Sequence, residues 1–211
     1  MERIAQLNCV IGGVGCGKTT IIKQISATQN RQLIVVKDYS TQGWENIAET
    51  KLQIKSDYIF TGSRKYIWKD NTSIQAIANF RKGIIILDDC RCYLDSLPSK
   101  EIKQIFSMRR HRETDVFAVT HSFKEMPPIF FEYADNFIIF QSVGSVEIRK
   151  KEIGDAYPII KEISDDVNLK SIDNPHYFRI VNRKQATATI LKQQQEILLQ
   201  KKNKKQRIKV S

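Results

Sequence analysis

The stretch Ile11-Gly12-Gly13-Val14-Gly15-Cys16-Gly17-Lys18-Thr19-Thr20 decides the fold that we expect for this chain of 211 residues. Gly12, Gly17, Lys18 and Thr19 match the G-x-x-x-x-G-K-[ST] pattern of a phosphate-binding loop. An apolar run precedes the glycines and a helical pattern follows them, which is the context that this loop requires. Glycines let the backbone bend so that successive N–H groups point at one anion. The stretch therefore predicts a nucleotide-binding loop rather than an ordinary glycine-rich turn.

The polar positions of the loop have separate physical roles. A helix that starts near Gly17 directs the positive end of its dipole at the phosphates. Lys18 supplies a charge for the β- and γ-phosphates, and the Thr19 hydroxyl can bind Mg²⁺. The chain lacks the Asn-Lys-x-Asp motif of guanine recognition, so the expected cofactors are ATP and Mg²⁺. The residues expected to bind the nucleotide are Gly12, Gly13, Val14, Gly15, Cys16, Gly17, Lys18, Thr19 and Thr20.

A second pattern is the aliphatic run Ile84–Leu87, which ends in Asp88 and Asp89. A continuous aliphatic run is typical of a parallel strand that is buried on both faces. Acids at its carboxyl end would lie beside the phosphate loop, as in a Walker B motif. Asp88 would then hold Mg²⁺ through water, and Asp89 would orient or deprotonate the attacking water. The alternative is a pair of acids that only caps the next helix.

The periodicity of the remaining sequence predicts alternating strands and helices. Asp38 and Tyr39 follow one of these strands and either border the nucleotide or form an ordinary loop. A turn is expected at residues 62–64, and Gly144 should turn the chain into residues 146–148. We expect strands at 4–11, 33–36, 58–60, 83–87, 115–121 and, as the last core strand, 136–140, with helices at 18–27, 44–54, 73–80, 98–112, 129–134 and 186–199.

This order predicts an α/β fold of the RecA-like (ASCE) P-loop class, with a central, mostly parallel sheet and helices on both faces. At least one extra strand separates the phosphate loop from the acid pair, which favours the branch with a strand inserted between the two motif strands. We expect an ATPase core at residues 1–150, an extension that packs on it at 151–199, and a flexible basic tail at 200–211.

The net charge of +11 favours a polyanionic partner, either nucleic acid or an anionic membrane face. Six of the basic residues crowd the tail, which could equally be a solvated, disordered end. No apolar run is long enough for a transmembrane segment, and the N-terminus lacks the features of a signal peptide. Reduced thiols explain the cysteines better than a zinc site does, because Cys90 and Cys92 have no second pair at suitable spacing.

The later motifs resemble those of the HerA–FtsK superfamily. They are Arg110-His111 before a strand, and Thr120 with the polar His121 at the end of that strand. The small size is similar to that of the genome-packaging ATPases of tailless, internal-membrane viruses and of the zonula-occludens-toxin-like proteins of filamentous phages. The resemblance implies that Asp88 serves the metal and Asp89 the water, and that Thr120 and His121 form a sensor.

The resemblance also implies that one arginine of residues 109–112 reaches the γ-phosphate of a neighbouring subunit, and Arg110 matches the pattern best. Two positions depart from the family pattern. The family usually has Glu where this chain has Asp89, and Gln where it has His121. Because Asp is one methylene shorter, water could be positioned less well and turnover could be slow.

Taken together, these features predict an ATP-driven DNA translocase that packages a viral genome as a ring of identical subunits. It would contact the DNA backbone without sequence preference and would act in the host cytoplasm or the virion, beside the capsid or its membrane vertex. The alternatives are an ATP-dependent switch or assembly factor of the toxin-like type and, third, a small-molecule phosphotransferase.

Overall fold

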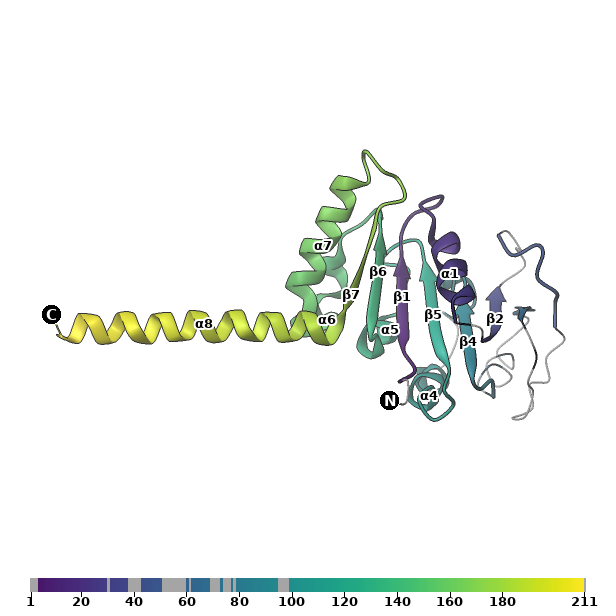
Figure 1. Cartoon of the computed structure of the whole chain (residues 1–211), viewed down its shortest axis with the longest axis horizontal. Helices are drawn as coiled ribbons and strands as arrows, with labels where there is room; N and C mark the ends of the chain where they lie inside the picture. Colours follow the sequence, from purple (N-terminus) through teal and green to yellow (C-terminus); the bar gives the residue numbers. More distant parts are fainter. Residues whose placement is uncertain are drawn as a thin grey trace.

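The computed structural model describes residues 4–29, 31–37, 43–50, 60, 62–68, 73, 77, 79–94 and 99–210. Within this part of the chain, the strands form one seven-stranded sheet in the order β3-β2-β4-β5-β1-β6-β7 (Figure 1). Neighbouring strands are parallel except for β6 and β7, which are antiparallel. The strands are β1 (Leu7–Ile11), β2 (Gln32–Lys37), β3 (Ser63–Ile67), β4 (Gly83–Leu87), β5 (Asp115–Thr120), β6 (Asn136–Phe140) and β7 (Phe178–Asn182).

Helices cover both faces of the sheet, as expected for parallel strands. Consecutive residues of a strand point to opposite faces, so that in β1 Cys9 and Ile11 join one apolar cluster and Val10 joins the other. The described helices are α1 (Lys18–Ala27), α3 (Arg91–Leu94), α4 (Ser99–Met108), α5 (Pro128–Tyr133), α6 (Lys150–Ile153), α7 (Tyr157–Lys170) and α8 (Arg183–Val210), with 3-10 turns η1 (Val146–Arg149) and η2 (Gly154–Ala156).

The order of the central strands confirms the RecA-like fold. β5 lies between β1, which leads into the phosphate loop, and β4, which ends at the acid pair. The inserted strand therefore follows the acid pair in sequence. The strands between the two motifs in sequence, β2 and β3, extend the sheet beyond β4. Because β1, β4 and β5 are parallel, their carboxyl ends meet at one edge of the sheet.

Several expected elements differ from the structure. Residues 44–50 form turns and an isolated bridge from Glu49 to Lys65 instead of a helix. The expected turn at 62–64 is wrong beyond Gly62, since Ser63 begins β3. The helix expected at 98–112 ends at Met108. Polar and charged residues at the start of β3 hide the strand pattern, as is common in edge strands.

Some expectations fall on residues that the structure does not describe. Asp38 and Tyr39 lie outside the described residues, as do most of the strand expected at 58–60 and most of the helix expected at 73–80. Gly144 has φ +110°, and the chain continues after it into η1.

The expectation that residues 136–140 form the last core strand is wrong, because β7 of the C-terminal extension pairs with β6. As an edge strand, β7 exposes Arg179 and Ile180 and buries only Val181, so it lacks the apolar run of an interior strand. After β7 the Arg183 guanidinium donates to the carbonyls of Phe131 (2.6 Å) and Ile153 (3.0 Å), which fixes the start of α8.

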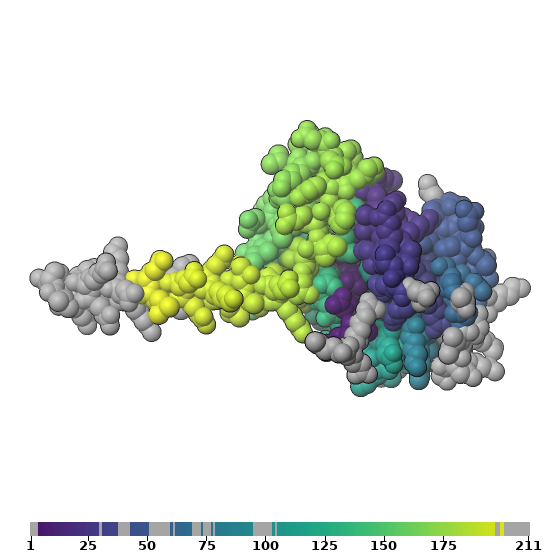
Figure 2. Space-filling model, in the orientation of Figure 1, coloured from purple at the N-terminus to yellow at the C-terminus, as the bar shows by residue number. Residues whose placement is uncertain are grey.

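Beyond its first turns, α8 projects away from the sheet (Figures 1 and 2). Its helical backbone continues through residues 201–210, the stretch that the sequence predicts as a flexible basic tail. In the part of the chain that the structure describes, no helix combines the length and apolar character needed to cross a bilayer.

Gly83 offers a test of the packing at the start of β4. A Cβ atom at this position would lie 2.3 Å from the Phe80 ring and 2.6 Å from the Gln32 carbonyl oxygen. Gly83→Ala should therefore lower the free energy of unfolding by about 1–3 kcal/mol in urea denaturation. Gly13→Ala is the control, because its Cβ would meet its nearest neighbour, the Gln141 carbonyl oxygen, at an ordinary 3.5 Å. Equal stability of the two variants would contradict this packing.

Candidate nucleotide-binding site

The phosphate loop connects β1 to α1 and is fixed at its start by two backbone hydrogen bonds. The Gly12 N–H donates to the Thr120 carbonyl (3.2 Å) at the end of β5, and the Gly13 N–H donates to the Gln141 carbonyl (2.7 Å) just after β6. Gly12 has no room for a side chain, since a Cβ would lie 2.4 Å from the Phe140 Cβ. The loop therefore begins in the middle of the sheet, held by the strands on either side.

The far end of the loop presents the N-terminus of α1. Gly17, the residue that precedes the helix, has φ +97° and supplies no capping side chain. The first amides of a helix need a partner outside it, and together with the helix dipole they form a site for an anion. This geometry agrees with the phosphate-binding role predicted for the loop.

Lys18 is buried and turns back over the loop. Its ammonium donates to the carbonyls of Gly12 (2.5 Å) and Gly13 (2.6 Å). Burial lowers the pKa of Lys18, while the Cys16 thiol and the carboxylates of Asp88, Asp89 and Glu125 act in the opposite direction. These three acids therefore lie close enough to the ammonium to influence its charge. The structure thus brings the predicted phosphate loop and the predicted acid pair together.

Asp88 is held by two donors that the sequence analysis did not identify. Its Oδ2 atom accepts hydrogen bonds from the Lys37 ammonium (3.0 Å) and the Trp44 indole N–H (2.8 Å). The Tyr93 hydroxyl also bonds to the Asp88 carbonyl (3.1 Å). Lys37 ends the aliphatic strand β2 at the edge that carries the loop, so its position in sequence was a usable signal. Trp44 gave no comparable signal, because its segment has no regular structure.

The residues predicted to hold Mg²⁺, Thr19 and Asp88, contact one short segment. Trp44 donates to the Asp88 carboxylate, and a Cβ on the preceding Gly43 would lie 3.9 Å from the Thr19 hydroxyl oxygen. Hydroxyl and carboxylate oxygens are suitable donors for Mg²⁺. Among the described residues, no group of three His, Cys, Asp or Glu side chains could hold a metal alone. The donor set therefore fits a Mg²⁺ ion that takes its remaining ligands from phosphate and water.

The second acid, Asp89, faces the predicted sensor residue His121. The Asp89 carboxylate and the His121 Nε2 lie 3.5 Å apart, and both side chains are partly exposed. Asp89 has φ +51°, in the left-handed region that few residues other than Gly, Asn and Asp adopt. The Thr120 hydroxyl bonds to the Ser122 carbonyl (3.2 Å) within the same turn. The ends of β4 and β5 thus place an acid and an imidazole beside each other near Lys18.

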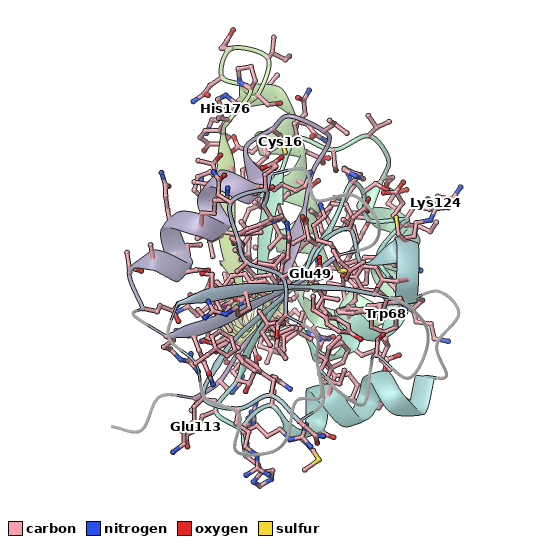
Figure 3. The ribbon with its side chains drawn as sticks, turned by 90° about the vertical axis from the view of Figure 1, so that its right-hand side faces the viewer. Cys16, Glu49, Trp68, Glu113, Lys124 and His176 are labelled. Atoms are coloured by element: carbon pink, nitrogen blue, oxygen red, sulfur yellow. The ribbon has the colours of Figure 1, made fainter. Side chains whose placement is uncertain are left out.

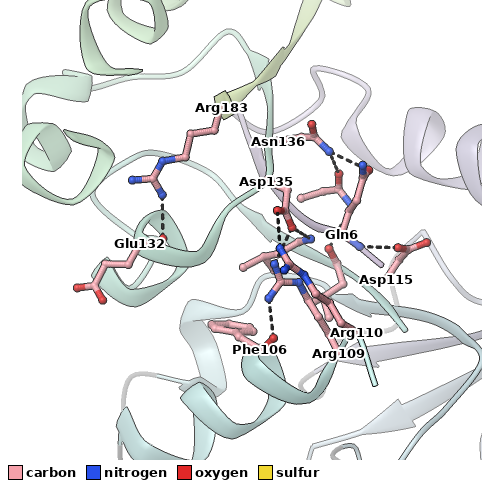
Figure 4. A network of polar contacts seen from close by, with 12 residues as sticks. Gln6, Phe106, Arg109, Arg110, Asp115, Glu132, Asp135, Asn136 and Arg183 are labelled. Atoms are coloured by element: carbon pink, nitrogen blue, oxygen red, sulfur yellow. Dashed lines mark hydrogen bonds and ion pairs between the residues drawn. The ribbon is translucent and has the colours of Figure 1, made fainter. Parts of the chain in front are cut away.

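The arginine cluster precedes β5, whereas the phosphate loop follows the parallel strand β1, so the two lie at opposite edges of the sheet. Figure 4 shows Arg109 and Arg110 beside Asp135. Arg109 is buried and donates to the Phe106 carbonyl (2.6 Å) and the Asp135 carboxylate (2.7 Å). The Arg110 side chain is 54% exposed and lies 3.8 Å from Asp135. Burial lowers the pKa of Arg112. Arg109 is thus used for packing, and Arg110 is the most accessible of the three.

Arg110 and His111 line a cleft of about 710 Å³ together with Arg31 and Lys82. Arg31 is paired with the Asp115 carboxylate (2.6 Å), and Glu113 also lines the cleft. The cleft therefore carries an excess of positive charge. It contains no residue of the chain's own phosphate loop.

The sheet order, the phosphate loop after β1 and the acid pair after β4 define the RecA-like fold of P-loop NTPases. Solved structures of B204, the genome-packaging NTPase of Sulfolobus turreted icosahedral virus 2, are similar to this chain. The complex with AMP has a TM-score of 0.63 at 14% identity and covers 88% of this chain and 96% of that chain. The complex with AMPPCP has a TM-score of 0.62 at 17% identity, with 86% and 94% covered.

A structure described as B204, the DNA-packaging ATPase from Sulfolobus turreted icosahedral virus, has a TM-score of 0.59 at 16% identity. Sequence identities this low show similarity of the fold alone. In its fold, the chain therefore has the predicted resemblance to the genome-packaging ATPases. The N-terminal domain of the zonular occludens toxin from Neisseria meningitidis has a TM-score of only 0.39. No protein-family profile matches the sequence. No curated protein matches it either.

Replacing Asp89 tests its role beside His121. Asp89→Asn should bind ATP almost normally and hydrolyse it about 10²-fold or more slowly, because an amide cannot accept the proton of water. Asn tolerates the left-handed backbone of this position, so the fold should persist. ATP affinity by calorimetry and single-turnover phosphate release measure the two properties.

The binding control is Lys18→Ala, which should lose ATP affinity because the phosphates lose the ammonium of the loop. Normal hydrolysis by Asp89→Asn would show that another acid, Asp88 or Glu125, activates the water.

Proposed function

We propose that this protein is an ATP-hydrolysing motor that moves DNA during viral genome packaging. The observation that carries the proposal is the convergence of the phosphate loop, Asp88, Asp89 and His121 at the ends of adjacent parallel strands. The fold similarity to B204 extends over nearly the whole of both chains. B204 is described as a genome-packaging NTPase, and its solved complexes contain AMP, AMPPCP and ATP-γS.

The residues of this edge supply the parts that phosphoryl transfer requires. The loop amides and Lys18 bind the phosphates, and Asp89 orients the attacking water. Mg²⁺, held by Thr19 and by Asp88, would neutralise charge on the β- and γ-phosphates. His121 stands 3.5 Å from Asp89, where its Nε2 can hydrogen-bond the water or the γ-phosphate. These roles account for nucleotide hydrolysis but not for DNA movement.

The position of Arg110 supports the proposal of a ring of subunits. This side chain is exposed and precedes β5, whereas the phosphate loop follows the parallel strand β1, so within one subunit Arg110 cannot reach the nucleotide. A neighbouring subunit that docks its loop against the basic cleft would bring Arg110 to its γ-phosphate. Asp135, 3.8 Å from the guanidinium, lines a second cleft of about 410 Å³ that Arg110 also borders.

DNA is the polyanion that best fits the charge of the chain. The net charge of +11 gives nonspecific attraction to a phosphate backbone. The last part of α8 is rich in lysine, with Lys201, Lys202, Lys204 and Lys205 in one stretch. Contacts to phosphates carry no sequence information, so binding should depend strongly on salt. The protein would act in the host cytoplasm and in the assembling virion, at the capsid or its membrane vertex.

The rate of ATP hydrolysis with and without DNA tests the motor function. We expect single- or double-stranded DNA to stimulate hydrolysis by the full chain, with an effect that falls as salt rises. Duplex affinity should fall with a log–log slope of about −0.9 for each phosphate contacted. Lys18→Ala is the control for contaminating ATPases. Hydrolysis that no form of DNA affects would favour an ATP-dependent assembly factor instead.

Arg110→Ala tests the role of the arginine across the subunit boundary. A guanidinium inserted at the transferring phosphoryl group raises the rate by roughly 10³- to 10⁵-fold, so the variant should bind ATP and hydrolyse it poorly. Mixing it with Lys18→Ala should restore some activity, because one subunit supplies an intact loop and its neighbour an intact Arg110. Co-assembly is checked by size-exclusion chromatography with light scattering. If mixed rings form and remain inactive, Arg110 does not act in trans.

A further inference from the structure

The segment between α7 and β7 brings a histidine from the C-terminal extension to the phosphate loop. A Cβ atom on Gly17 would lie 3.3 Å from Nδ1, 3.8 Å from Cγ and 3.9 Å from Cβ of His176. The imidazole therefore stands directly against the backbone of the residue that precedes α1. Figure 3 shows His176 at the same end of the molecule as Cys16, and in Figure 2 the α7–β7 surface borders that of α1.

The position of His176 is fixed by hydrogen bonds within its own turn. The backbone N–H of His176 donates to the Asn174 side chain (3.1 Å), and the Tyr177 N–H donates to the Asn174 carbonyl (2.8 Å). At the other end of the turn, the Ser171 hydroxyl bonds to the Asn168 carbonyl (2.8 Å). This turn is therefore ordered by local contacts on both sides of the imidazole.

The turn is also tied to the strands that hold the phosphate loop. The Phe178 ring, two residues after His176, stacks on Phe140 with centroids 5.1 Å apart. Phe140 in turn packs against Gly12 at the start of the loop. The Asn168 side chain accepts a hydrogen bond from the Ser142 N–H (3.1 Å) just after β6. His176 thus has a defined place relative to the loop.

The sheet order indicates which part of a nucleotide His176 faces. Asp88 and Asp89 follow β4, on one side of β1. In the proposed function they serve the Mg²⁺ ion and the attacking water, both beside the γ-phosphate. His176 precedes β7, on the other side of β1. With the γ-phosphate near the acids and Lys18, the chain of phosphates runs along the loop. We therefore expect the nucleoside on the β6–β7 side.

The surroundings of His176 suit a base. The imidazole is exposed, and within the described residues its ring nitrogens make no hydrogen bond. Val143 is 90% exposed in the turn after β6, and Ile172 is 74% exposed in the turn before β7. Both turns lie at the edge of the sheet that carries the loop, since β6 ends and β7 begins there. Exposed apolar groups and an aromatic ring at one edge of the sheet are the kinds of group against which a planar base packs.

We propose that His176 binds the nucleoside end of the nucleotide by packing its imidazole against the base. The inference rests on the proposed nucleotide-binding function and adds a residue of the C-terminal extension to that site. Aromatic side chains stack on every base, so the contact adds affinity without selecting one base strongly.

The test compares ATP with inorganic tripolyphosphate, which has the phosphates but no nucleoside. By calorimetry on the full chain with Mg²⁺, His176→Ala should weaken ATP binding about 5- to 150-fold, the range of one base–aromatic stack. Its tripolyphosphate affinity should not change. His176→Phe should keep most of the ATP affinity, because its ring can still stack. Asp173→Asn, an exposed position of the same turn, is the matched control.

Three outcomes would overturn the inference. Unchanged ATP affinity of His176→Ala would show that the imidazole only borders the loop, while the nucleotide-binding function would stand. An equal loss for ATP and tripolyphosphate would place His176 on the phosphates instead. If the unaltered protein bound neither ligand, the proposed function would fail together with the inference. Melting temperatures of the variants confirm that each remains folded.

Discussion

The arrangement of the core depends on where the first amides of the phosphate loop find acceptors. The Gly12 N–H bonds to the Thr120 carbonyl and the Gly13 N–H to the Gln141 carbonyl, at the ends of β5 and β6. Both bonds require β1 to lie between two parallel neighbours that end at the same edge. The contact of Gly12 with Phe140 excludes any side chain there. Because β5 is the neighbour of β1 on this side, β4 is the second strand from β1. The acid pair after β4 is therefore separated from the phosphate loop by the width of one strand, β5.

A buried carboxylate is costly unless it is paired, and this cost explains the surroundings of Asp88. Lys37 and Trp44 donate to the same carboxylate oxygen, so the negative charge is compensated within the protein. A metal bound directly to this carboxylate would bring a second cation beside the Lys37 ammonium. Contact through a water molecule keeps the two cations further apart. The water-mediated role of Asp88 stays a prediction, and the repulsion between the two cations is the physical reason for it.

The parts that could be predicted from the sequence are those in which a local pattern has one structural solution. The glycines before Lys18 and the aliphatic run before Asp88 each specify a strand with its loop, and both strands were predicted. Patterns that depend on distant partners were missed. β7 is a strand because it pairs with the free edge of β6. β3 begins with Ser63, Arg64 and Lys65, so its first residues lack the apolar pattern of a strand. His176 and Trp44 reach the site from segments without regular structure. No periodicity marks His176, and the periodicity around Trp44 predicts a helix that residues 44–50 do not form.

The antiparallel direction of β7 gives the C-terminal extension access to both edges of the sheet. The strand begins beside Phe140, at the edge of the phosphate loop, and ends beside Asn136 at the opposite edge. There the Arg183 N–H donates to the Asp135 carbonyl, and the Asp135 carboxylate holds Arg109 and approaches Arg110. Because one short strand spans these points, its register with β6 fixes both the turn that carries His176 and the start of α8. A parallel strand would have begun at the opposite edge and ended at the edge of the loop, which would exchange the places of the turn and of the start of α8.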